Sequence, residues 1–373
     1  MKYKITVWAM ALLIIGLSLF NLIQQDKEYS ISERRKLAQF PKVTVSAVLS
    51  GKFMTDFEQY TQDQFAGRDS LRGLKAAAEF YGLGKKDNNG LYMIDGYLSS
   101  LEYPLDEDSI EHAVKKFGAI YETYLDGHAN QVFISVIPDK NYFMAEENGY
   151  LSMEYPEFFA AVEKQADFAK YIDISDLLSL NDYYKTDTHW KQECIVDVAG
   201  RLGLTMIGPE EAAGILSSNI MVSPYKEELF SDQFYGTYAG QFALGVEPDE
   251  IICLSNDILD NCQVYDYQNG VYRSVYDEEL GNGKDPYEVY LSGDISLTTI
   301  TNPEGSTGRK LVLFRDSFGS SIAPLLMEYY DEITLVDIRY ILSNQIGNYI
   351  DFDGKDVLFL YSTLVLNNSE TIK

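Results

Sequence analysis

Cysteine, histidine and basic residues are scarce in this chain of 373 residues. It holds three cysteines and three histidines, and its 30 lysines and arginines stand against 57 acidic residues, for a formal net charge of −27. A charge of this sign repels the phosphates of nucleic acids and of anionic lipids. The composition therefore excludes nucleic acid as a partner, and three cysteines are too few for a disulfide framework.

The scarce cysteines and histidines give no sign of a metal site. Cys253 and Cys262 flank a turn-rich stretch, and their spacing fits both a disulfide and two free thiols. Cys194 is expected to be a free, buried residue. His112 and His128 lie on or at the end of an expected helix and have no cysteine or histidine partners at metal-binding spacing. We expect neither a metal nor another cofactor.

A long apolar run stands near the start of the chain. Residues 5–23 are uncharged and mostly apolar, with Lys2 and Lys4 before them and polar residues 24–26 after them. At about 1.5 Å per residue, this run can cross a hydrocarbon core of roughly 30 Å. The two lysines favour a cytoplasmic N-terminus and an exported main domain. A cleaved signal peptide is the alternative, but small residues typical of a cleavage site are missing from 20–23.

The sequence predicts three parts. Residues 1–25 form a single-pass anchor in the cell membrane, 26–89 a helical stem, and 90–373 the main domain. In the stem, Phe53, Phe57, Tyr60 and Phe65 recur at helical or near-helical spacing, which indicates a packing face.

The main domain is expected to have an α/β fold. Apolar, strand-like runs occupy 131–137, 170–174, 311–314, 333–337 and 357–361, and helical patterns cover 108–126, 154–168 and 319–330. Strands separated by helices indicate a mostly parallel sheet covered on both faces. Residues 90–98 read as a hairpin that turns at Asp95-Gly96, and 224–300 reads as a β-rich insertion.

Two short motifs carry the chemistry. Asp187 and His189 are separated by one residue, a spacing that in an extended segment projects both side chains to the same side. Ser317 follows the apolar run 311–314 and precedes a helical pattern. A serine needs a base to become a nucleophile, and histidine with an orienting carboxylate supplies one. The residues predict Asp187, His189 and Ser317 as a catalytic triad, although Asp316-Ser317 taken alone also fits a helix N-cap.

Taken together, these segments resemble the DHHW protein family, which is similar to the SGNH-hydrolase-like alginate O-acetyltransferase proteins. The resemblance rests on Asp187-Thr-His189-Trp190, Asp316-Ser317, the 90–98 hairpin and Glu33-Arg34-Arg35 with Pro41. It implies an SGNH-hydrolase-like three-layer fold. It also implies that Ser317 is the nucleophile, His189 the base and Asp187 its orienter.

Two positions depart from the family pattern. Arg315 stands where glycine usually precedes the Asp-Ser pair, and Thr188 replaces the first histidine of the namesake motif. The first change puts a long cation at a tight turn. The second leaves the members of the triad in place.

Four further residues are weaker candidates for substrate or oxyanion binding. Trp190 follows the histidine, and Lys140 stands in a loop directly after strand 131–137. Arg339 and Asn367 follow the last two strands, where parallel sheets gather their ligands. An exposed lysine and plain loop residues are the structural alternatives.

The sequence is compatible with three functions. The first is an O-acetyltransferase or acetylesterase acting on a cell-envelope or secreted polysaccharide, with an acetyl donor or a membrane acyl-exporting protein as partner. The second is a catalytically silent protein that binds polysaccharide or scaffolds an export complex. The third is a general lipase or peptidase. No Gly-x-Ser-x-Gly motif is present, which speaks against an α/β-hydrolase.

Overall fold

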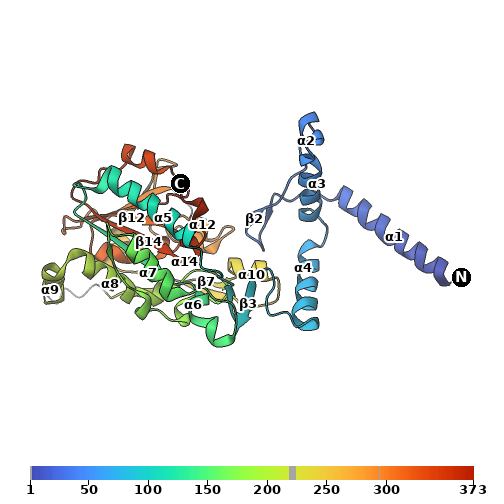
Figure 1. The fold of residues 1–373 in the computed structure, drawn as a ribbon, viewed down its shortest axis with the longest axis horizontal. Coiled ribbons are helices and arrows are strands. Elements are labelled where there is room, and N and C mark those ends of the chain that lie inside the picture. Colours follow the sequence, from blue (N-terminus) through green and yellow to red (C-terminus); the bar gives the residue numbers. More distant parts are fainter. Residues whose placement is uncertain (1, 218–223, 294) are drawn as a thin grey trace. The chain divides into compact units, whose positions relative to one another are not determined.

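The computed structural model describes residues 2–217, 224–293 and 295–373 (Figure 1). The chain divides into two compact units. Unit 1 comprises Met1–Tyr92 and Thr237–Val246, and unit 2 comprises Met93–Gly236 and Glu247–Lys373.

The first element of unit 1 is a long apolar helix. Helix α1 spans Lys2–Ile23, and its segment Tyr3–Ile23 has a mean hydropathy of 2.1 with no residue buried. Its length and composition fit a membrane span, and a signal sequence would meet the same criteria.

The rest of unit 1 consists of short strands and helices. Its elements are β1 (Tyr29–Ser30), β2 (Arg35–Lys36), α2 (Val45–Leu49), α3 (Lys52–Asp63), α4 (Arg68–Ala77) and α10 (Thr237–Phe242). Gly51 and Gly67 precede α3 and α4 with φ of 79° and 71°, a left-handed conformation that glycine adopts without strain. On α3, Phe53 stacks on Phe57, and Tyr60 packs edge-on against Phe40.

A hairpin stands where the chain passes from unit 1 to unit 2. Strands β3 (Leu91–Ile94) and β4 (Tyr97–Ser100) pair with each other. Asp95 and Gly96 between them have φ of 50° and 85°, as a tight two-residue hairpin turn requires. The predicted hairpin is confirmed.

An eight-stranded sheet forms the centre of unit 2. Its order is β10-β9-β11-β13-β12-β14-β5-β6, and the pairs from β13 to β6 are parallel. The parallel strands are β13 (Glu332–Val336), β12 (Lys310–Arg315), β14 (Asp356–Ser362), β5 (Gln131–Ile137) and β6 (Lys170–Tyr171). The antiparallel edge is β11 (Leu297–Thr301), β9 (Gln263–Asp266) and β10 (Val271–Arg273). The predicted α/β fold with a mostly parallel sheet is confirmed.

Apolar side chains cover both faces of this sheet. Along β12, Leu311 and Leu313 join one core cluster, and Val312 and Phe314 join the other. Alternate residues of a strand point to opposite faces, so a strand buried on both sides must be apolar throughout. Helix α8 (Val196–Ile207) packs into the first cluster, and α5 (Glu107–Ile120) and α7 (Tyr155–Gln165) pack into the second. The result is three layers (Figure 1).

Short elements complete unit 2. Strands β7 (Lys226–Phe234) and β8 (Asp249–Ser255) form a separate antiparallel pair. The remaining α-helices are α6 (Lys140–Met144), α9 (Pro209–Ser217), α11 (Asp257–Asn261), α12 (Glu278–Gly281), α13 (Gly319–Ile322) and α14 (Thr363–Leu366). The helix expected over 319–330 is shorter: α13 gives way at Pro324, which lacks an N–H, to a 3₁₀ helix over Pro324–Glu328.

All three cysteines are free thiols. Cys253 and Cys262 are buried, and Cys194 is half-buried. Cys253 lies in β8 and Cys262 follows α11, and the two belong to different core clusters. The disulfide that their spacing left open is therefore not formed.

Candidate active site

The carboxyl end of β12 leads directly into a buried turn that carries Ser317. Asp316 holds this turn, since its carboxylate accepts hydrogen bonds from the Phe318 backbone N–H at 3.0 Å and from the N–H and hydroxyl of Ser362, each at 2.7 Å. Ser362 ends the neighbouring strand β14. The aspartate of the Asp-Ser pair therefore fixes the backbone of the turn, and the Ser317 side chain remains half-buried at its tip.

A second loop brings a histidine to this serine. Residues 184–189 form a loop closed by the Tyr184 N–H, which donates to the His189 carbonyl at 3.0 Å, and by a bridge between Tyr183 and Trp190. The Ser317 hydroxyl donates to His189 Nε2 at 2.7 Å, and His189 Nδ1 donates to Asp187 Oδ1 at 2.6 Å. Asp187 accepts from Nδ1, so the proton of the neutral imidazole lies there and Nε2 is free to act as the base.

Burial increases from Ser317 through His189 to Asp187. Asp187 is completely buried, His189 is 9% exposed, and Ser317 is the most accessible of the three. A carboxylate in a low-dielectric position interacts strongly with an imidazolium that forms beside it. The arrangement suits proton transfer from a serine that substrates reach from solvent.

The loop that carries Asp187 is fixed by another carboxylate. Asp249 accepts hydrogen bonds from the Lys185 N–H at 2.8 Å, the Thr186 N–H at 2.7 Å and the Thr186 hydroxyl at 2.6 Å. The Gly236 N–H also donates to the Thr186 hydroxyl, at 2.9 Å. Gly236 lies so close to the loop that a Cβ there would overlap the backbone and Cβ of Asp187.

Tyr287 is the main component of the site that the sequence did not reveal. Its ring stacks on the His189 imidazole, with 3.8 Å between centroids and 8° between planes. Its hydroxyl donates to Ser321 Oγ at 3.0 Å. Tyr287 lies in a short 3₁₀ helix, Pro286–Val289, 98 residues from the histidine, with no motif around it. No periodic signal could have found it.

Trp190 is buried beneath the serine turn rather than open to substrate. Its indole Nε1 donates to the Phe318 carbonyl at 3.2 Å and to Ser321 Oγ at 2.9 Å. The residue therefore joins the histidine loop to the serine turn. We assign it no substrate contact.

Lys140 is buried as well, and no solvent-exposed loop holds it. Its Nζ donates to the carbonyls of Tyr184 and Lys185 at 2.8 and 3.2 Å. Burial lowers its pKa to about 7, while the charges of Asp187, Asp249 and Asp139 act in the opposite direction. These bonds make Lys140 a support of the Asp187 loop.

Arg315, the departure from the family's glycine, points away from solvent. It is 1% exposed, donates to the carbonyl of Asp316 at 3.3 Å, and lies 3.6 Å from the Asp337 carboxylate. Arg339 pairs with the same carboxylate through Nε at 2.9 Å and Nη2 at 2.6 Å. The two arginines therefore share one buried aspartate at the carboxyl edge of the sheet.

Asn367 supports the start of helix α5 rather than the triad. Its Oδ1 accepts from the Asp106 N–H at 2.8 Å, and its Nδ2 donates to the Pro104 carbonyl at 3.1 Å. Asp106 is the N-cap of α5. Both polar atoms are engaged in holding this helix start, so Asn367 is not an oxyanion donor in the mechanism proposed below.

Comparison with known proteins supports the fold. The chain is similar to the crystal structure of a DHHW family protein from Eubacterium siraeum DSM 15702, at 22% identity and a TM-score of 0.58, over 77% of this chain and 95% of that one. It is also similar to Bacillus cereus PatB1, at 15% identity and a TM-score of 0.55, over 76% of this chain and 98% of that one.

A second structure of PatB1, with a sulfonyl adduct, matches with a TM-score of 0.54 at 15% identity, over 74% of this chain and 95% of that one. No protein-family profile and no curated protein sequence matches the chain. These likenesses establish the fold: the predicted resemblance to a DHHW protein and the SGNH-hydrolase-like α/β architecture are confirmed.

Proposed function

We propose that this chain is a membrane-anchored serine acyl-transfer enzyme that acts on O-acetyl groups of a polysaccharide outside the cytoplasm. The observation that carries the proposal is the unbroken hydrogen-bond chain from Ser317 through His189 to Asp187. His189 and Ser317 are 128 positions apart in the chain. A purely structural cap on the serine turn would need no such chain.

The first half of the reaction forms an acyl-enzyme. Ser317 Oγ attacks the carbonyl carbon of an acetyl ester while its proton passes to His189 Nε2, and the Asp187 carboxylate stabilises the resulting imidazolium. The bond from the carbonyl carbon to the leaving oxygen then breaks, and the leaving group takes the proton from His189. Ser317 is left as the acetyl ester.

The second half transfers the acetyl group. A hydroxyl of the acceptor gives its proton to His189 Nε2 and attacks the acetyl carbonyl, and Ser317 Oγ leaves and recovers the proton. If the acceptor is a sugar hydroxyl, the enzyme is a transferase, and if it is water, the enzyme is an esterase. Help from a positioned general base is worth roughly 10²–10⁴-fold in rate.

The membrane placement draws support from the end of α1. Asn21 Oδ1 accepts from the Ala66 N–H at 2.7 Å, and Gln24 Nε2 donates to the Gln64 carbonyl at 2.9 Å. A signal peptide would lose the first of these bonds on cleavage. We propose that α1 stays in place as the anchor, with the N-terminus in the cytoplasm and unit 2 outside it.

Replacement of the nucleophile in cells tests the whole proposal. Ser317→Ala is compared with Ser320→Ala, a matched change three residues further along that removes no bond to His189. Mass spectrometry of envelope glycans should show altered O-acetyl content only for Ser317→Ala. A fall indicates a transferase, and a rise an esterase.

Reagent labelling gives a direct check on the same serine. PatB1 has been solved with a sulfonyl adduct, and sulfonyl fluorides are the matching reagent class for the solubilised full chain. Peptide mass analysis should place the adduct on Ser317 and find none in His189→Ala. A folded Ser317→Ala protein with unchanged glycans, in cells where deletion of the gene has an effect, would instead favour a silent binding protein.

A further inference from the structure

Charge is divided very unevenly between the two units. Unit 1 holds 13 of the 30 lysines and arginines but only 9 of the 57 acidic residues, so nearly all of the negative charge belongs to unit 2. A local excess of cations in a chain of net charge −27 needs a separate physical reason.

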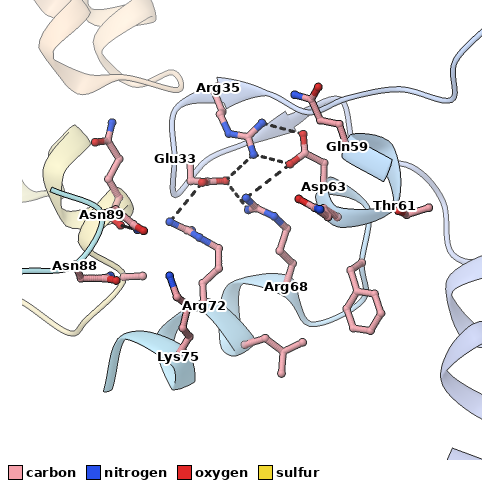
Figure 2. Close-up of a pocket in the computed structure, with 15 residues that line it drawn as sticks. Glu33, Arg35, Gln59, Thr61, Asp63, Arg68, Arg72, Lys75, Asn88 and Asn89 are labelled. Carbon is pink, nitrogen blue, oxygen red and sulfur yellow. Dashed lines mark hydrogen bonds and ion pairs between the residues drawn. The ribbon is translucent and has the colours of Figure 1, made fainter. Parts of the chain in front are cut away.

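Four of the 13 cations of unit 1 line a cavity of about 1130 Å³. Its charged lining residues are four cations, Arg35, Arg68, Arg72 and Lys75, and two carboxylates, Glu33 and Asp63. All of its lining residues belong to unit 1. Figure 2 shows the three guanidinium groups converging on Glu33. Four cations against two carboxylates leave the lining with a surplus of positive charge.

The two carboxylates hold the arginines in fixed positions. Arg35 donates to both oxygens of Asp63, at 2.8 and 2.5 Å, and Arg68 pairs with Glu33 (Figure 2). These bonds lower the pKa of Asp63. Arginines fixed in this way lose little further freedom when they bind an anion.

Two cations of the lining are less fully neutralised. Arg72 lies 3.4 Å from the Glu33 carboxylate and 3.7 Å from that of Asp69, both distances longer than the bonds of Arg35 to Asp63, and Arg72 donates to the Gly240 carbonyl at 2.8 Å. Lys75 Nζ lies 3.8 Å from the Glu79 carboxylate, and the lysine side chain is 58% exposed. Arg72 and Lys75 are therefore the groups best placed to meet an anion in the cavity.

A buried acceptor in the same lining points to a ligand as well. Asn88 is 3% exposed, and its Nδ2 donates to the Phe242 carbonyl at 2.6 Å. Its Oδ1 is buried, and no residue that the structure describes donates a hydrogen bond to it. A buried acceptor left without a donor costs free energy, which a ligand carrying a hydroxyl beside its anionic group would recover.

The end of α1 lies close to this cavity. Asn21 on α1 bonds to Ala66, two residues before Arg68, and the Tyr60 hydroxyl donates to Asp26 at 3.0 Å, three residues after α1 ends. If α1 spans a bilayer, these bonds keep the start of α4 near the lipid headgroups.

We propose that the cavity of unit 1 binds the phosphate of an anionic phospholipid headgroup. Arg72 and Lys75 contact the phosphate oxygens, as arginine and lysine do in phosphate sites generally, and Asn88 Oδ1 accepts from a hydroxyl of the headgroup. The inference rests on the proposed membrane anchorage and not on acyl transfer. It is therefore tested on Ser317→Ala protein.

The experiment uses the full chain in neutral detergent. Native mass spectrometry and calorimetric titration measure binding of short-chain phosphatidylglycerol, short-chain phosphatidylcholine and inorganic phosphate. Arg72→Gln and Lys75→Gln are compared with Lys52→Gln, which removes the same charge from unit 1 at an exposed residue outside the cavity lining. Thermal unfolding checks that each variant is folded.

Phosphatidylglycerol should bind more tightly than phosphatidylcholine, and each cavity variant should weaken that binding about tenfold, in line with the loss of one charge-assisted contact. Lys52→Gln should bind as the parent does. If inorganic phosphate binds as tightly as phosphatidylglycerol does, with the same dependence on Arg72 and Lys75, the cavity is an anion site but its assignment to lipid is wrong. Equal binding by folded cavity variants and Lys52→Gln would overturn the site itself.

Discussion

The phenol ring of Tyr287 lies parallel to the imidazole of His189, with 3.8 Å between ring centroids. In the proposed reaction, His189 accepts a proton from Ser317 at Nε2 while it holds its own proton at Nδ1. Its ring must therefore keep a fixed plane. Asp187 fixes the ring at Nδ1, and Tyr287 covers its face. We therefore interpret Tyr287 as a positioning residue for the base.

Loss of this ring should lower kcat more than it changes KM. Tyr287→Leu removes the stacking, which is worth about 0.5–1.5 kcal/mol and corresponds to a reduction of up to about tenfold in rate. Tyr287→Phe keeps the ring and should retain most of the activity. Steady-state kinetics of acetate release from an activated ester measure both. Equal losses in the two variants would assign the role to the hydroxyl instead.

Single and double removal of the nucleophile and the base should give nearly the same residual rate. Ser317→Ala, His189→Ala and the double variant each break the same hydrogen-bond chain, and members of a triad act as a unit. Turnover of an activated ester by the three purified proteins checks this. Losses that multiply would show that another group serves as the base.

Gly236→Ala should disable the site although Ser317, His189 and Asp187 are all unchanged in sequence. The new methyl group would overlap the backbone of Asp187, so the loop must move. Displacement of a catalytic group by about 1 Å can cost of the order of 10²-fold in rate. Gly245→Ala is the control, because a Cβ there meets nothing within 4 Å. Comparable activity of the two variants would contradict this account of the loop.

The stability of unit 2 should depend on pH through Glu328. Burial raises the pKa of Glu328 from 4.5 to about 7, although a hydrogen bond with Tyr225 acts against this. Between these values the folded chain keeps a proton that the unfolded chain releases, so stability falls as the pH rises from 4.5 to 7.

Glu328→Gln imitates the protonated side chain and should remove this dependence. Its Tm should exceed that of the parent protein by a margin that grows from pH 5 to pH 8. Glu147→Gln, at an exposed position, serves as the control. If the Tm difference between Glu328→Gln and the parent stays constant from pH 5 to pH 8, the folded chain does not hold the proton.

The protein recovered from membranes should retain its first residues. The bonds of Asn21 and Gln24 to residues 64–66 integrate the end of α1 into unit 1. Intact mass measurement should give the uncleaved chain, and external protease should digest the segment after Asp26 while an N-terminal tag stays protected. A chain that begins beyond residue 23 would identify α1 as a signal peptide.

The parts of the fold that follow from local pattern could be read from the sequence. The strands over 131–137 and 357–361 are buried on both faces, so each is an unbroken apolar run. Asp187 and His189 stand two residues apart, and Ser317 follows a strand. This pattern was enough to predict that the three side chains lie close together.

Contacts between segments far apart in the chain could not be read in this way. Asp249, Gly236 and Tyr287 support the triad from places where no periodicity or motif marks them. Lys140 was expected at a loop surface, but its carbonyl partners at 184 and 185 become neighbours only after folding. The same limit applies to Asn367, whose partners lie more than 260 residues earlier in the chain.

The hydrogen bonds between Asp316 and Ser362 have a consequence for the order in which the site is completed. Two of the three bonds to the Asp316 carboxylate come from Ser362, which lies 46 positions further along the chain. Until Ser362 has been synthesised, the turn with Ser317 lacks these bonds. A chain that stops before Ser362 therefore lacks the bonds that fix the Ser317 turn, and the site proposed here stays unassembled in it.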